Sequence, residues 1–144
     1  ILSNGKNAAE AYPSAVARAK AILLYSSMPG TSRHHWGTDL DINDLNNVYF
    51  ETGEGAALFT WMEENAADFG FCRPYTAKGD HRLFGYEEEK WHWSYMPLSI
   101  PLTKAATRKL KNEDISGFKG DEAVDSIDVV GLYVLGIDPS CLGE

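Results

Sequence analysis

Two short stretches of this sequence hold the residue types that can bind a metal ion and move a proton. Residues 32–41 read Ser-Arg-His-His-Trp-Gly-Thr-Asp-Leu-Asp, and residues 89–95 read Glu-Lys-Trp-His-Trp-Ser-Tyr. They contain three of the four histidines of the chain, His34, His35 and His92. Imidazole and carboxylate are zinc ligands, and a catalytic zinc site uses three protein ligands while keeping one position open. The pattern therefore predicts a metal site shared by the two stretches.

Taken one at a time, the same histidines have simpler interpretations. His34 and His35 fit a polar loop whose imidazoles face water, and His92 fits a buried histidine on an aromatic strand. A chain without any metal site, folded as a plain α+β domain, remains an alternative at this point.

Length, composition and charge exclude several other classes. The 144 residues are enough for a single domain (1–144) with its own core. No apolar run approaches the roughly 18–20 residues of a membrane span. The net charge of -8, with 13 Lys and Arg against 21 Asp and Glu, argues against nucleic acid as a partner.

The two cysteines and the first residues say little about compartment. Cys72 and Cys141 lack the CxxC spacing of a zinc ribbon and are too few for a disulfide scaffold. They fit either one disulfide or two free buried thiols. The chain begins with Ile1 and lacks the pattern of a signal peptide, so we expect that it has been trimmed and lacks an N-terminal segment.

Hydrophobic periodicity predicts a mixed fold. The alanine-rich segment 13–27 favours a helix. Alternation over residues 38–43 favours a half-buried strand with Thr38, Leu40 and Ile42 on one face and Asp39, Asp41 and Asn43 on the other. The remaining elements that we expect are a short strand at 48–50, a helix at 56–69 ending at Gly70, strands at 71–73 and 91–95, and helices at 103–111 and 121–135.

Taken together, the motif residues resemble a known signature. The chain resembles the VanY-like D-alanyl-D-alanine carboxypeptidases, in the larger lysostaphin, D-Ala-D-Ala and Hedgehog group of zinc proteins. The resemblance covers residues 32–95. The residues that carry it are Ser32, His34, Gly37 and Asp41 in the first stretch and Glu89, Trp91, His92 and Tyr95 in the second.

The resemblance implies a role for each matching residue. His34, Asp41 and His92 would bind one Zn2+ per chain, and Glu89 would be the catalytic base. Such a centre lowers the pKa of water to about 7, and a free glutamate can take the proton and later hand it to the leaving amine. From the motif alone, the substrate-binding residues would include Ser32, Trp91 and Tyr95.

Chemistry alone also allows a shifted pair of ligands, His35 with Asp39, although the family register favours His34 with Asp41. Because Glu89 and His92 are three residues apart, a flat strand would place them on opposite faces. We therefore expect Glu89 in a turn or bulge that leads into the strand.

The sequence departs from the family pattern in one respect. The family carries an arginine in a Gly-Tyr/Phe-Arg-Ser segment, where it stabilises the developing oxyanion. No such segment lies before Ser32, where the only arginine is Arg18. We expect the arginine upstream of Ile1, with Arg33, Arg73 and Arg82 as weaker candidates.

The resemblance implies a zinc metallopeptidase of the cell envelope, periplasmic or exported, that acts on peptidoglycan stem peptides, first of all as a D-Ala-D-Ala carboxypeptidase. An L,D-carboxypeptidase, an L-Ala-D-Glu endopeptidase and a non-catalytic, zinc-stabilised binding module are the alternatives. The expected fold is α+β: a small, mainly antiparallel sheet with helices packed on one side. We expect the zinc cleft on the open face of that sheet.

Overall fold

A three-stranded antiparallel sheet brings the two motif stretches together. The structure is a computed structural model that describes residues 5–143. Strand β3 (His92–Tyr95) lies between β1 (Asp39–Asp41) and β2 (Phe71–Cys72), and both neighbours run antiparallel to it. The register places Asp41 opposite His92 and Asp39 opposite Ser94. The predicted α+β class with a small antiparallel sheet is confirmed.

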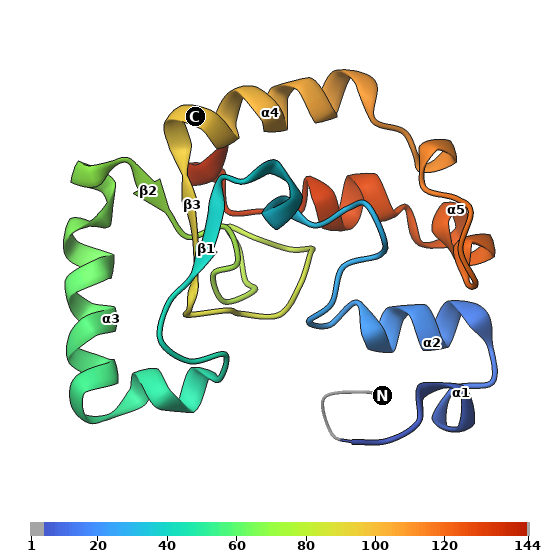
Figure 1. The fold of residues 1–144 in the computed structure, drawn as a ribbon, viewed down its shortest axis with the longest axis horizontal. Coiled ribbons are helices and arrows are strands. Elements are labelled where there is room, and N and C mark those ends of the chain that lie inside the picture. The colour runs from blue at the N-terminus through green and yellow to red at the C-terminus, as the bar shows by residue number, and fades with distance from the viewer. Residues whose placement is uncertain (1–4, 144) are drawn as a thin grey trace.

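Helices make up most of the remaining regular structure and surround the sheet (Figure 1). No helix within residues 5–143 has the length and apolar character that crossing a membrane would require. The α-helices are α1 (Ala8–Ala11), α2 (Ala15–Ile22), α3 (Gly53–Asn65), α4 (Met96–Lys109) and α5 (Val124–Ile127).

The predicted helix at 13–27 is correct in its centre and wrong at its C-terminal end. Ser14 caps α2 by accepting a hydrogen bond from the Ala17 amide, and the helix ends at Ile22. Beyond it, the Leu24 carbonyl accepts a hydrogen bond from the Glu87 amide at 2.8 Å. This tertiary contact draws residues 24–27 away from the helix.

The predicted strand at 48–50 is wrong, because residues Asn47–Glu51 form a 3-10 turn. The side chain of Asn46 accepts a hydrogen bond from the Val48 amide and caps that turn. Asparagine offers the backbone such a local alternative to strand pairing.

The helix predicted at 56–69 is confirmed with an earlier start. Helix α3 begins at Gly53 and is extended by the 3-10 turn Ala66–Phe69, which ends at Gly70 with a positive φ of 83°. The strands predicted at 71–73 and 91–95 correspond to β2 and β3. Helix α4 begins directly after β3, seven residues before the expected helix at 103–111, with Pro97 in its first turn.

The helix predicted at 121–135 is interrupted. Asp128 adopts a positive φ of 57°, which separates α5 from a π-helical turn at Val130–Val134. The Asp128 side chain accepts hydrogen bonds from the Gly131 amide and from Asn112. The predicted apolar face is confirmed nevertheless, since Val124, Ile127, Val130 and Val134 are all buried.

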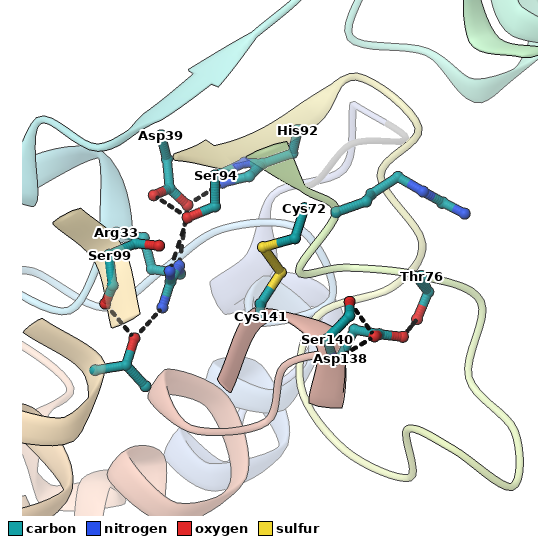
Figure 2. Close-up of a disulfide and its surroundings, with 12 residues drawn as sticks. Arg33, Asp39, Cys72, Thr76, His92, Ser94, Ser99, Asp138, Ser140 and Cys141 are labelled. Atoms are coloured by element: carbon teal, nitrogen blue, oxygen red, sulfur yellow. Dashed lines mark hydrogen bonds and ion pairs between the residues drawn. A yellow bond between two sulfur atoms is a disulfide. The ribbon is translucent and has the colours of Figure 1, made fainter. Parts of the chain in front are cut away.

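The C-terminal region supplies much of the core. Val124, Ile127 and Val130 belong to the same buried cluster as Tyr75 and Tyr86. Cys72 and Cys141 form a disulfide with a Cα–Cα separation of 5.6 Å, which joins β2 to the C-terminal turn (Figure 2). Of the two states that the sequence allowed for the cysteines, the structure has the bridged one.

Loss of this disulfide should destabilise the fold. The bond links residues 69 positions apart in sequence, and a loop of that size restricts the unfolded chain by about 4 kcal/mol in the chain-entropy account. Urea denaturation of Cys72→Ala/Cys141→Ala should show a loss of that order relative to the oxidised wild type. The wild type in excess reductant is the control, and an unchanged midpoint in both samples would contradict the prediction.

Candidate metal centre

Three residues of the two motif stretches converge on one point. One potential ligand atom from each of His34, Asp41 and His92 lies within 4.8 Å of the other two. The Nε2 atom of His34 is 3.4 Å from Asp41 Oδ2, and Nδ1 of His92 is 3.3 Å from Asp41 Oδ1. Within residues 5–143, no other group of three His, Cys, Asp or Glu side chains is close enough to hold a metal ion.

Local structure around residues 32–41 explains how His34 and Asp41 reach this point. Ser32 caps the 3-10 turn Arg33–Trp36 by accepting a hydrogen bond from the His34 amide at 3.3 Å. Gly37 ends the turn with a φ of 68°, a conformation that side chains disfavour, and directs the chain into β1. The antiparallel register then places Asp41 opposite His92.

Glu89 lies beside this group, just before β3. Its side chain is only 9% exposed, and its Oε2 atom is 3.4 Å from His92 Nδ1. The His92 amide donates to the Glu89 carbonyl, which closes a turn ahead of the strand. The prediction that Glu89 precedes the strand in a turn is confirmed.

Asp39 occupies a different environment from Asp41. Its side chain is fully buried, with Oδ2 at 2.9 Å from Arg33 Nε and 2.8 Å from His92 Nε2. Its other oxygen accepts hydrogen bonds of 2.7 Å from the hydroxyls of Thr38 and Ser94. The geometry therefore groups Asp41, rather than Asp39, with His34, and His35 lies outside the group.

On β1 the carboxylate face holds a buried side chain, and the apolar face is partly exposed. Asp39 and Asp41 share a face, as the alternation predicts, and both contact His92. That face carries the fully buried Asp39 side chain, whereas Leu40 on the other face is 40% exposed. Burial of a carboxylate is possible here because Arg33, itself 1% exposed, neutralises it.

Burial and hydrogen bonding act in opposite directions on these groups. Burial alone would lower the pKa of His92, but hydrogen bonds to Asp39, Asp41 and Glu89 outweigh it and raise the pKa to about 10. Burial alone would raise the pKa of Asp39, but hydrogen bonds from His92 and the charge of Arg33 hold it well below its usual value. Without a metal, these contacts keep His92 protonated and Asp39 ionised.

The three residues and Glu89 line one cavity of about 880 Å³. Residues 25–29 and 45–47 form two of its walls, and Tyr75 and Tyr86 also line it. Of the substrate-binding residues implied by the resemblance, Ser32 and Trp91 line the cavity. Tyr95 does not, and its ring packs against Phe71 with the centroids 5.2 Å apart.

No arginine or lysine lines this cavity in the part of the chain that the structure describes. Arg33 is bound to Asp39, Arg73 donates to Glu63 and Glu88, and Arg82 donates to backbone carbonyls. All three weaker candidates for the oxyanion-stabilising cation are thus held in other contacts. The expectation of an arginine upstream of Ile1 stays a prediction.

Sequence reasoning missed several residues that shape this site. Tyr75 stacks edge-on against His92, with ring centroids 4.7 Å apart, and contacts Tyr86 in the same way. Ser94 follows His92 by two positions on β3, and this period-two spacing could have indicated that both side chains lie on the same face of the sheet. Residues 25–27 of the cavity wall carried no signal, because they lie within the segment 13–27 that was predicted as a helix.

Comparison with curated proteins finds two relatives. The chain is 34% identical to a D-alanyl-D-alanine carboxypeptidase of Enterococcus faecalis over 90 residues, 62% of this chain and 31% of the relative. It is 32% identical to an uncharacterized protein of Haemophilus influenzae over 80 residues, 47% of this chain and 60% of the relative. The matches thus span about a third of the length of the first relative and 60% of the length of the second.

Solved structures also show similarity. One is the structure of the LdcB LD-carboxypeptidase, which is described as revealing the molecular basis of peptidoglycan recognition. It has 27% sequence identity to this chain and a TM-score of 0.42, and the match covers 77% of this chain and 57% of that chain. DacB from Streptococcus pneumoniae has 23% identity and a TM-score of 0.42, with 91% and 60% covered.

The family comparison covers both motif stretches. The VanY family model, described as D-alanyl-D-alanine carboxypeptidase, matches residues 6–98. This range includes His34, Asp41, Glu89 and His92 and extends over more than half of the chain. The chain therefore belongs to the VanY family of D-alanyl-D-alanine carboxypeptidases.

Proposed function

We propose that this chain is the catalytic part of a zinc-dependent peptidase that cleaves peptidoglycan stem peptides next to a D-amino acid, with D-Ala-D-Ala carboxypeptidase as the first candidate activity. The observation that carries the proposal is that His34, Asp41, His92 and Glu89 meet in one cavity of a VanY-family chain. Because the proposed substrate is peptidoglycan, the activity would lie in the cell envelope, at a periplasmic or exported location.

The residues present fit a zinc ion. Two imidazole nitrogens and one carboxylate form a common donor set for catalytic zinc, which leaves one position free. The second nitrogen of each imidazole is hydrogen-bonded, His34 Nδ1 to the Asp39 carbonyl at 3.2 Å and His92 Nε2 to the Asp39 carboxylate. Such outer contacts are usual around metal-binding histidines. The His34 and Asp41 side chains are 41% and 32% exposed, so the group is accessible from solvent.

The chain's own residues would divide the reaction between them. When bound, zinc supplies Lewis acidity, which lowers the pKa of water and polarises a carbonyl. Glu89, whose side chain is largely buried and lies 3.4 Å from His92 Nδ1, takes the proton of the attacking water. It then returns this proton to the leaving amine, so the amide bond breaks without a net change in Glu89. Ser32 and Trp91 contribute to the cavity wall against which the peptide lies.

The non-catalytic alternative is less well supported by the site. A structural zinc ion needs a closed set of ligands and no free base. Here a carboxylate that is not part of the three-residue group lines the same cavity. Glu89 therefore favours an enzyme over a zinc-stabilised binding module.

Product analysis tests the proposal and separates the alternative activities. Purified chain should contain about one zinc ion per molecule and should release the terminal D-alanine from a muramyl pentapeptide, as measured by mass spectrometry. Release of D-alanine only from a tetrapeptide would indicate an L,D-carboxypeptidase, and cleavage between L-Ala and D-Glu an endopeptidase. Zinc binding with no cleavage of any of these peptides would overturn the enzymatic proposal.

The affinity for zinc should rise with pH. Because the pKa of His92 in the metal-free chain is raised to about 10, this residue is protonated near neutral pH and must release a proton when zinc binds. Release of one proton makes the apparent affinity increase about tenfold per pH unit. Competition with a chromophoric chelator between about pH 6 and about pH 8 measures this slope. A flat profile would show that His92 does not exchange its proton for the metal.

A further inference from the structure

Asp39 contacts both histidines of the candidate metal centre on the side that faces away from Asp41. His92 turns Nδ1 toward Asp41 at 3.3 Å and Nε2 toward the Asp39 carboxylate at 2.8 Å. His34 does the reverse, with Nε2 3.4 Å from Asp41 and Nδ1 3.2 Å from the backbone carbonyl of Asp39. We propose that Asp39 is a positioning residue that determines which nitrogen of each histidine binds the metal.

The chemical reason lies in the tautomers of imidazole. A neutral imidazole carries one N–H, and only its other nitrogen can bind a metal. A carbonyl and a carboxylate are acceptors only, so each ring must present its N–H to Asp39. His92 would therefore bind through Nδ1 and His34 through Nε2.

Asp39 can act in this way because its own position is tightly held. Arg33 Nε donates to the oxygen that contacts His92, and Ser94 and Thr38 donate to the other oxygen. Arg33 is in turn anchored by hydrogen bonds of 3.0 Å to Thr103 and 2.9 Å to Ser94. Figure 2 shows Arg33, Asp39, Ser94 and His92 gathered in this network.

This network also distinguishes Asp39 from a ligand. Arg33, Ser94 and Thr103 are each no more than 1% exposed, and the Asp39 side chain is fully buried. To turn toward the metal, Asp39 would have to leave the Arg33 guanidinium without its carboxylate partner in a buried site, which is strongly destabilising. Its contribution is therefore to hold the imidazoles.

The two contacts differ in a way that makes the inference testable. The side chain of Asp39 holds His92, whereas its backbone holds His34. Removal of the side chain should therefore disturb the coordination of His92 and spare the hydrogen bond to His34. A general loosening of the fold would affect both rings.

The inference rests on the proposed zinc site, and long-range 1H–15N NMR of the zinc-loaded wild type tests it without any substitution. The expected spectrum has His92 bound through Nδ1 with Nε2 protonated, and His34 bound through Nε2 with Nδ1 protonated. The opposite tautomer of either ring would overturn the inference alone. A wild type that binds no zinc would overturn the proposed function as well.

A pair of variants measures the contribution of the side chain. Arg33→Met/Asp39→Asn keeps an acceptor oxygen beside His92 Nε2, and Arg33→Met/Asp39→Ala removes it; neither variant leaves a buried unpaired charge. We expect zinc affinity close to wild type for the asparagine variant and about 10–100-fold weaker for the alanine variant. The alanine variant should shift the His92 signals and leave the His34 tautomer unchanged. Equal affinities of the two folded variants, with unchanged His92 signals, would overturn the inference.

Discussion

Glu89→Gln should slow peptide cleavage by about 10²–10⁴-fold and leave zinc binding unchanged. Glutamine has nearly the same shape as glutamate, but it cannot accept the proton of the attacking water. Glu89 is almost buried and lies 3.4 Å from His92 Nδ1, so the substitution alters the charge at the site with little change in packing. Peptide turnover and metal content, measured on the same preparation, give both quantities.

Glu87→Gln is the matched control for this experiment. It is the same substitution two residues away, at a carboxylate that pairs with Lys78 on the surface and is 38% exposed. We expect wild-type turnover from it. If Glu89→Gln kept full activity, the base would have to be another residue, and if it lost zinc, Glu89 would be a ligand.

His34→Ala should weaken zinc binding by more than about 100-fold, because loss of a direct ligand exceeds the 10–100-fold effect of losing an outer contact. Peptide cleavage should be lost with the metal. The His34 side chain is 41% exposed, so its truncation leaves the fold largely intact. Competition with a chromophoric chelator gives the affinity, and circular dichroism verifies folding.

The neighbouring histidine supplies the control and tests the ligand register. His35 lines the same cavity but lies outside the group formed by His34, Asp41 and His92. His35→Ala should therefore bind zinc as the wild type does. Loss of zinc by His35→Ala together with retention by His34→Ala would favour the shifted register and reject the assignment of His34.

Residue types alone left two ligand registers open, and the resemblance to the family favoured one of them. The family motif selected His34, Asp41 and His92, and the structure brings these three together. The three-residue separation of Glu89 and His92 correctly predicted that Glu89 lies in a turn before β3. The position of Glu89 could be predicted because it depends on the geometry of a few consecutive residues.

Interactions between distant segments decided the rest, and they changed local structure where they competed with it. The contact between Leu24 and Glu87 accompanies the early end of helix α2. The turn at Asn47–Glu51 has a local cause instead, since the side chain of Asn46 caps it where strand propensity predicted a strand. Periodicity describes one segment at a time and carries no information about such partners.

The clearest case is the pair of aspartates on β1. Alternation in the sequence correctly placed Asp39 and Asp41 on one face, but it could not assign them different environments. Only the tertiary structure buries Asp39, because Arg33 reaches it from the preceding turn and Ser94 from β3, while Thr103 of α4 holds Arg33 in place. A carboxylate tolerates burial only when such partners neutralise it and satisfy its hydrogen bonds. The sequence by itself thus indicated which groups could hold a metal, and tertiary packing determined which of them lie together.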